Sequence, residues 1–123
     1  MFIKDRRRNP RFGCTGHADV LLAADAPLLP ARIVNVSKGG CLIELQKSQS
    51  LDQSTSAELT FKVNCLPFRM RARAAAIRSD TMIGFEFPVL SERVRGQLEE
   101  LIEELAADWR KRFAAHRWCV EDF

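Results

Sequence analysis

The chain has 123 residues, of which 46% are hydrophobic and 28% are charged, and its formal net charge is +3. This balance predicts one soluble globular domain and excludes a disordered chain. No apolar run approaches the ~18–20 residues that cross a bilayer, and the start of the chain lacks the apolar segment of a signal peptide. We therefore expect a cytoplasmic protein with no membrane span.

Positive charge is concentrated at the start of the chain. In residues 1–12, five basic side chains and one acidic side chain give a net charge of +4, so the remaining 111 residues carry −1. Pro10 disfavours a helix here because it pushes the residue before it towards extended geometry. We expect residues 1–12 to form a flexible basic arm that binds an anionic partner.

Six short apolar stretches, separated by turn-forming residues, follow the arm. Period-two alternation and β-branched residues predict strands over 18–24, 31–36, 41–45, 57–63, 68–77 and 82–87. In 68–77, apolar side chains alternate with Arg69, Arg71 and Arg73 on the other face. Gly13 and Gly16 are interpreted as a loose connection before the first strand. Six short strands with this spacing are typical of a small antiparallel β-barrel, which we place at residues 18–87.

A helix is predicted after the last strand. Pro88 ends the sheet, and Ser91 can cap a helix. Apolar residues then recur at steps of three and four from Val94 to Phe113, which predicts one apolar face on a helix over residues 91–115. Such a helix is about 35 Å long at 1.5 Å per residue, more than one small barrel covers. We expect its distal end, from Trp109 to Trp118, to leave apolar surface for a partner or a second copy.

The connection between the second and third predicted strands has a distinctive sequence. Residues 35–40 read Asn-Val-Ser-Lys-Gly-Gly. The two glycines predict a tight turn, because glycine allows positive φ and close approach to the backbone. Asn35 and Ser37 are two residues apart, so on an extended segment their side chains would point to one face. A polar pair of this kind, on the rim of a sheet, can hold a polar ligand.

The arm and this turn together resemble the PilZ family of cyclic di-GMP receptors. The family signature is an R-x-x-x-R pair, followed about two dozen residues later by [D/N]-x-S-x-x-G. Arg7 and Arg11 match the first part, and Asn35, Ser37 and Gly40 match the second. The resemblance implies that residues 1–123 are a single PilZ domain, with a six-stranded antiparallel PilZ-type β-barrel, a long C-terminal α-helix and a ligand-binding arm.

The resemblance also assigns roles to the arginines. Cyclic di-GMP presents two phosphates and two guanines, and a guanidinium group can bind phosphate oxygens or the guanine O6/N7 edge and stack on a base. We expect Arg7 and Arg11 to make these contacts, with Arg6 and Arg8 as candidate accessory contacts. Binding should order the arm over the barrel.

The turn residues receive complementary roles. Asn35 and Ser37 are expected to bind a guanine edge through their side chains, and Gly40 is expected to keep the turn tight. The resulting hypothesis is a signalling receptor that binds cyclic di-GMP and transmits the bound state to a downstream protein, for example in motility or exopolysaccharide control. The sequence leaves open whether the chain forms a homodimer.

Two other functions are compatible with the sequence. One is a PilZ-like adaptor that acts without ligand, through protein contacts of its C-terminal helix. The other is a small nucleic-acid-binding barrel that uses the arm and the stripe of arginines from Arg69 to Arg73. The absence of RNP-type aromatic motifs disfavours nucleic acid as a partner.

Catalysis and metal binding are not predicted. The sequence contains no G-x-x-x-x-G-K-[ST] phosphate loop, no G-x-S-x-G nucleophile elbow and no H-E-x-x-H metal pair. We therefore expect no enzyme, no catalytic residues and no cofactor beyond the ligand. Cys14-x-x-His17 and His116-x-x-Cys119 have the spacing of zinc ligands. Nothing requires the two pairs to meet, so we predict no metal site.

Overall fold

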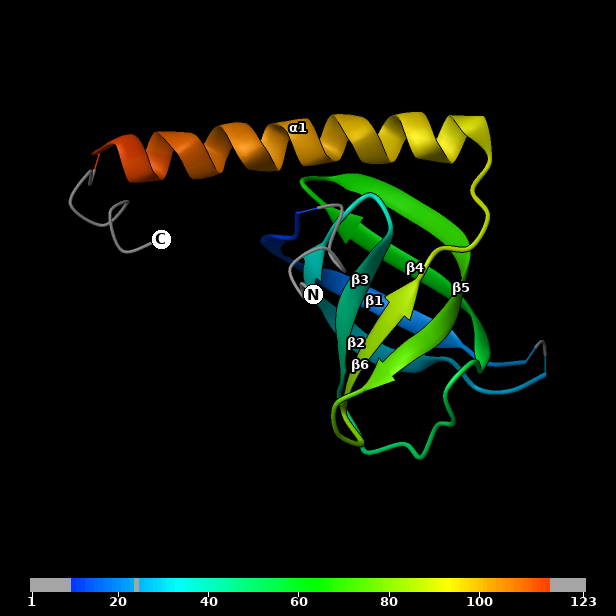
Figure 1. Cartoon of the computed structure of the whole chain (residues 1–123). Helices are drawn as coiled ribbons and strands as arrows, with labels where there is room; N and C mark the ends of the chain where they lie inside the picture. Colours follow the sequence, from blue (N-terminus) through cyan, green and yellow to red (C-terminus); the bar gives the residue numbers. More distant parts are fainter. Residues whose placement is uncertain (1–9, 24, 116–123) are drawn as a thin grey trace, which may run out of the picture.

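The computed structural model describes residues 10–23 and 25–115. Six strands form a closed antiparallel barrel, followed by one helix (Figure 1). The elements are β1 (Phe12–Leu21), β2 (Leu29–Val36), β3 (Gly40–Leu45), β4 (Ser56–Val63), β5 (Leu66–Ile77), β6 (Met82–Glu86) and α1 (Glu92–Ala115). The strand order around the barrel is β1-β2-β3-β6-β5-β4, closed by pairing of β1 with β4. The predicted barrel with a C-terminal helix is confirmed.

Alternate side chains of the strands fill the barrel interior, as the pleat of a strand requires. On β4 the buried side chains alternate with more exposed ones, as predicted, and they are Ala57, Leu59, Phe61 and Val63. The ring of Phe61 stacks on that of Phe68 from β5, with their centroids 5.2 Å apart. The apolar face of β5 also points inward, and its three arginines are exposed.

Strand β1 begins at Phe12 rather than at residue 18, so the barrel starts earlier than predicted. Gly13 and Gly16 belong to this strand and are not a loose connection. The register of β1 against β2 shifts between these two glycines, and such a shift breaks the alternation from which a strand is predicted. A Cβ atom at Gly16 would overlap the carbonyl oxygen of Lys62, which explains the glycine. The other predicted element ends either coincide with the observed ones or differ from them by at most three residues.

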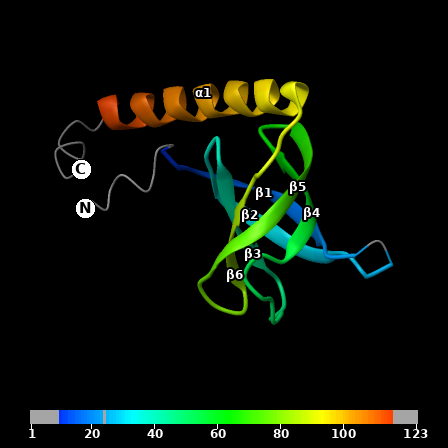
Figure 2. The same ribbon diagram turned by 45° about the vertical axis from the view of Figure 1, so that its right-hand side comes forward.

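Helix α1 lies across one end of the barrel in two views of the molecule (Figures 1 and 2). Ser91 caps it as predicted, because the Ser91 hydroxyl accepts a hydrogen bond from the Val94 backbone N–H at 3.2 Å. Its apolar face is buried against the barrel through Leu98, Leu101, Ile102 and Leu105. Over residues 10–23 and 25–115, no helix is both long and apolar enough to cross a membrane.

The C-terminal half of α1 extends past the barrel, as expected from its length (Figures 1 and 2). Trp109, in this half, is 40% exposed. The side chain of Phe113 and the whole of Trp118 lie outside the described residues. Nearer the barrel, the Asn64 side-chain amide donates a hydrogen bond to Glu104 Oε1 at 3.2 Å, which ties the β4–β5 hairpin to the helix.

Candidate functional site at the β2–β3 turn

The Ser37 side chain shapes the turn between β2 and β3. Its hydroxyl accepts hydrogen bonds from the backbone N–H groups of Gly39 and Gly40, both at 3.2 Å. The Ser37 N–H donates to the Gly40 carbonyl at 2.8 Å. A serine hydroxyl that satisfies backbone donors in this way stabilises a turn. Because β2 ends at Val36, Ser37 is not on an extended segment, and the expectation based on a shared strand face was wrong.

Gly40 is required by close packing and not by backbone conformation. No glycine in the described part of the chain has a positive φ, so the first predicted reason for the glycines was wrong. The second, close approach of another group to the backbone, is confirmed at Gly40. A Cβ atom at Gly40 would instead overlap the carbonyl oxygen of Phe85 and lie 3.3 Å from Glu86 Cα. The Gly39 carbonyl also accepts a hydrogen bond from the Phe87 N–H at 2.9 Å. The turn is therefore fastened to the end of β6.

Asn35 presents an unused acceptor beside this turn. It is half-buried, lies outside the core cluster, and follows a register shift between β2 and β3. Its Oδ1 atom is buried and has no hydrogen-bond partner within residues 10–23 and 25–115. A buried acceptor without a partner costs about 1–3 kcal/mol, so a hydrogen bond to a donor at this position would be favourable. Asn35 is thus suited to bind a hydrogen-bond donor.

The surface beside Asn35 is open on its β1 side. Gly13 of β1 is its partner on one side, and nothing lies within 4 Å of the position of a Cβ atom at Gly13. Leu42 of β3 is its partner on the other side, and Leu42 in turn pairs with Gly84 of β6. This row crosses four strands, and two of its four positions lack a side chain. At Gly13, on the β1 side of Asn35, a planar group can therefore approach the backbone closely. A role for Gly13 was not predicted from the sequence. The register shift in β1 means that the pairing of Gly13 with Asn35 cannot be inferred from the alternation of residues.

The start of β1 brings the arm to the turn. Phe12 pairs with Val36, the residue before Ser37, so Arg11 stands opposite the beginning of the turn in this antiparallel register. Burial raises the pKa of the Cys41 thiol in β3, and Arg11 opposes this rise, as a nearby positive charge must. The backbone at Arg11 therefore lies beside the turn that carries the other three predicted residues. Arg6, Arg7 and Arg8 lie outside the described residues.

Cys14 and His17 are not placed as a pair of metal ligands. Burial raises the pKa of the Cys14 thiol to about 11, so this thiol is neutral at physiological pH. Cys14 packs against the core, whereas the His17 side chain is 67% exposed. The two side chains therefore do not form a ligand pair. His116 and Cys119 lie outside the described residues, within which no three His, Cys, Asp or Glu side chains form a metal-binding group.

The arginine stripe on β5 is partly neutralised by neighbouring strands. Arg69 forms an ion pair with Glu58 of β4 at 3.0 Å, and Arg73 forms one with Glu86 of β6 at 2.5 Å. Two of the three cations in the stripe therefore already have carboxylate partners. This reduces the positive field that a nucleic acid would need along the stripe.

Comparison with known proteins places this fold. The sequence model of one family, described as the PilZ domain, matches residues 5–104. Among solved structures, the PilZ domain of YcgR from Escherichia coli with c-di-GMP has a TM-score of 0.67 at 20% identity, over 87% of this chain and 96% of that chain. YcgR from Escherichia coli in complex with c-di-GMP has a TM-score of 0.73 at 24% identity, over 89% of this chain.

A third solved structure is the inhibitor of motility MotI/DgrA from Bacillus subtilis, with a TM-score of 0.66 at 13% identity over 86% of this chain. The chain spans about half the length of two of these structures, covering 50% of the YcgR complex and 52% of MotI/DgrA. None of the curated proteins matches the chain. The structural likenesses establish the fold, and the family match covers most of the sequence. The chain belongs to the PilZ domain family.

Proposed function

We propose that the chain is a cyclic di-GMP receptor that binds the dinucleotide at the β2–β3 turn and passes the bound state to another protein. One observation carries the proposal: the pairing of Phe12 with Val36 sets the end of the basic arm against the turn that holds the other signature residues. YcgR of Escherichia coli, which has the same fold, is described in complex with c-di-GMP. The sequence motif, the fold and the strand register together support cyclic di-GMP as the ligand of this chain.

In this proposal, the turn and its neighbours bind guanine. The unused Oδ1 of Asn35 accepts a hydrogen bond from an N–H group of the base, which relieves the cost of its buried, unpaired state. The space at Gly13 admits the ring against the backbone. Ser37 and Gly40 hold the turn in the shape that presents Asn35, so the contribution of Ser37 is chiefly to position its neighbours.

The arm supplies the positive charge. Arg7 and Arg11 bind phosphate oxygens or a guanine edge through their planar guanidinium groups, and Arg6 and Arg8 add accessory contacts. An arm with a net charge of +4 has a strong electrostatic preference for a ligand with two phosphates. Arm closure over the turn changes the molecular surface, and a downstream protein reads that change.

Calorimetric titration of the full chain with cyclic di-GMP tests the proposal. Because one bidentate arginine contact is worth about 1–3 kcal/mol, Arg7→Ala and Arg11→Ala should each weaken binding by about tenfold or more. Neither variant should lower the melting temperature. Arg78→Ala, at an exposed position just after β5, serves as the matched control and should bind normally. Unchanged affinity in both arm variants would overturn the assignment.

A thermal-shift comparison separates this function from the two alternatives. A ligand that binds only the folded state raises the melting temperature, so cyclic di-GMP should do so and GTP should not. A ligand-independent adaptor would respond to neither nucleotide. A nucleic-acid-binding barrel would respond to a short oligonucleotide, with a steep dependence on salt.

A further inference from the structure

We propose that the free edge of β5, with the groove beside it, binds an extended acidic segment of another protein, which adds to β5 as an extra strand. The groove lies between β5 and the segment 88–94. This site uses none of the residues proposed to bind the dinucleotide. It stands or falls independently of that function.

The edge is free because β6 covers only part of β5. Pairing of these two strands runs from Arg73 with Glu86 to Ile77 with Ile83. Residues 66–72 of β5 therefore pair with β4 alone. The other edge of these residues faces a gap. After β6 the chain stays on the opposite side of this gap, where the Phe87 N–H donates a hydrogen bond to the carbonyl of Gly39.

The β4–β5 hairpin determines which backbone groups face this gap. Its two turn residues, Asn64 and Cys65, have positive φ values of 53° and 66°, as in a two-residue type I′ turn. In such a hairpin the flanking residues exchange hydrogen bonds, so even-numbered residues of β5 direct their backbone groups towards β4. Ala74, which is also even-numbered, is consistent with this assignment, because its N–H donates a hydrogen bond to the carbonyl of Thr55, just before β4, at 2.9 Å.

Odd-numbered residues of β5 consequently direct their backbone groups into the gap. Arg69 and Arg71 each offer an N–H and a carbonyl there, whereas Pro67 offers a carbonyl alone. Apart from the hydrogen bonds of the regular helices and paired strands, no backbone hydrogen bond within the described residues involves these positions. Exposed strand edges of this kind are templates for pairing with another chain.

Two adjoining hollows form the groove beside the edge. Their volumes are about 600 and 390 Å³, and both are lined by Arg69, Ser91 and Val94. Apolar side chains are accessible along it, because Val89 is 80% exposed and Leu66 is 36% exposed. An extended segment lying along β5 could place alternate apolar side chains against these residues.

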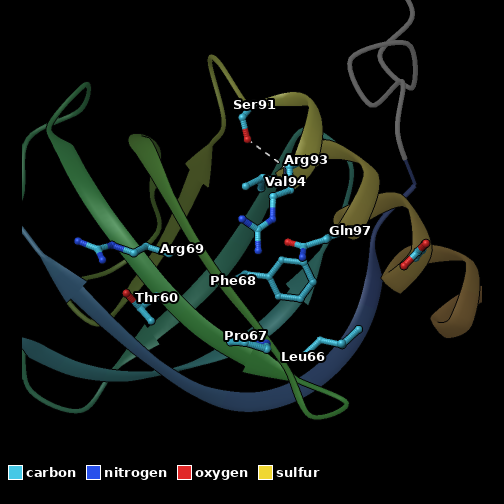
Figure 3. Close-up of a pocket in the computed structure, with 10 residues that line it drawn as sticks. Thr60, Leu66, Pro67, Phe68, Arg69, Ser91, Arg93, Val94 and Gln97 are labelled. Atoms are coloured by element: carbon cyan, nitrogen blue, oxygen red, sulfur yellow. Dashed lines mark hydrogen bonds between the residues drawn. The ribbon is translucent and has the colours of Figure 1, made fainter.

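Positive charge favours an acidic occupant. The lining includes the side chains of Arg69, Arg71 and Arg93 but a single carboxylate, that of Glu100. Arg69 is paired with Glu58, whereas Arg71 and Arg93 form no ion pair within the described part of the chain. Figure 3 shows Arg93 reaching from the helix into the space in front of β5. The N-terminus of α1 adds positive potential at the same place.

These features together specify the occupant. An extended backbone completes the hydrogen bonds of Arg69 and Arg71, which a helix cannot do. Glutamate or aspartate side chains meet the two unpaired arginines, whereas lysine side chains would be repelled. The partner segment is therefore extended, acidic and interspersed with apolar residues.

A peptide titration followed by NMR of the ¹⁵N-labelled full chain tests this proposal. The probe is a heptapeptide that alternates glutamate and valine. It should shift the backbone amide signals of Arg69 and Arg71 and slow their exchange with solvent. A peptide with lysine in place of glutamate should not bind. The glutamate–valine peptide N-methylated at alternate amides should bind at least about threefold more weakly, because it loses hydrogen bonds to the edge.

Variants of the protein provide the second arm of the test. Because each charge reversal replaces an attraction with a repulsion, the double variant Arg71→Glu/Arg93→Glu should bind the acidic peptide roughly tenfold more weakly. Arg78→Glu, outside the groove, should bind it normally. No amide shift at Arg69 and Arg71 up to about 1 mM peptide, or equal binding of the N-methylated peptide, overturns the proposal. The titration contains no cyclic di-GMP, so failure here leaves the proposed receptor function untouched.

Discussion

The two polar side chains of the β2–β3 turn have different roles in the folded protein. The hydroxyl of Ser37 is committed to the backbone of its own turn, whereas Oδ1 of Asn35 is buried without a partner in the described part of the chain. The motif identified both residues, but it could not distinguish them. Their difference arises because β2 ends between them, at Val36, which depends on the pairing of neighbouring strands.

Alanine substitutions should separate these two roles. Ser37→Ala removes the acceptor for two backbone donors and should lower the free energy of unfolding by about 0.5–1.5 kcal/mol. Asn35→Ala removes an unpaired acceptor and should not lower it. Both variants should weaken cyclic di-GMP binding. Urea unfolding and calorimetry measure the two effects, and a larger loss of stability in Asn35→Ala than in Ser37→Ala would contradict this account.

The close packing at Gly40 leads to a second prediction about stability. In Gly40→Ala, the new methyl group would overlap the backbone of Phe85, which cannot rotate away, so the variant should lose about 1–3 kcal/mol of stability. Gly13→Ala is the control, because nothing lies within 4 Å of its Cβ position, and it should change stability by less than about 1 kcal/mol. Equal urea midpoints for the two variants would refute the packing argument.

At the scale of whole elements, strands and helices with a regular hydrophobic periodicity could be predicted from the sequence. The clean alternation of β4 and the three–four spacing of α1 correctly predicted both elements and their buried faces. Strand β1 was misplaced because its register shift and two glycines interrupt the alternation. The free edge of β5 was not predictable, since it depends on where β6 stops alongside it. Likewise, the motif identified the arm and the turn, but only strand register shows that Arg11 reaches the turn.

The anchoring of α1 can be tested directly. Leu101 is fully buried between the helix and the barrel, so Leu101→Ala should lower the free energy of unfolding by about 2–5 kcal/mol. Gln97→Ala, at an exposed position one turn earlier, should have little effect. Urea unfolding monitored by circular dichroism compares the two. A small effect at Leu101 would mean that the helix does not depend on the barrel.

For the molecule as a whole, the proposed ligand turn and the β5 groove are linked by a backbone hydrogen bond. The hydrogen bond from the Phe87 N–H to the Gly39 carbonyl fastens the turn to the segment that continues as one wall of the groove. One small barrel therefore carries a basic arm, a rigid turn and a free strand edge. Helix α1 closes one end of it and extends beyond (Figure 2).

The central claim is that the dinucleotide binds where the arm meets the turn. The most direct measurement follows the backbone amides of the ¹⁵N-labelled full chain during titration with cyclic di-GMP. The largest shifts should fall on residues 35–40 and on Arg11, Phe12 and Gly13, which lie opposite them in the strand register. Shifts that avoid both segments at saturation, or no shifts at all, would contradict it.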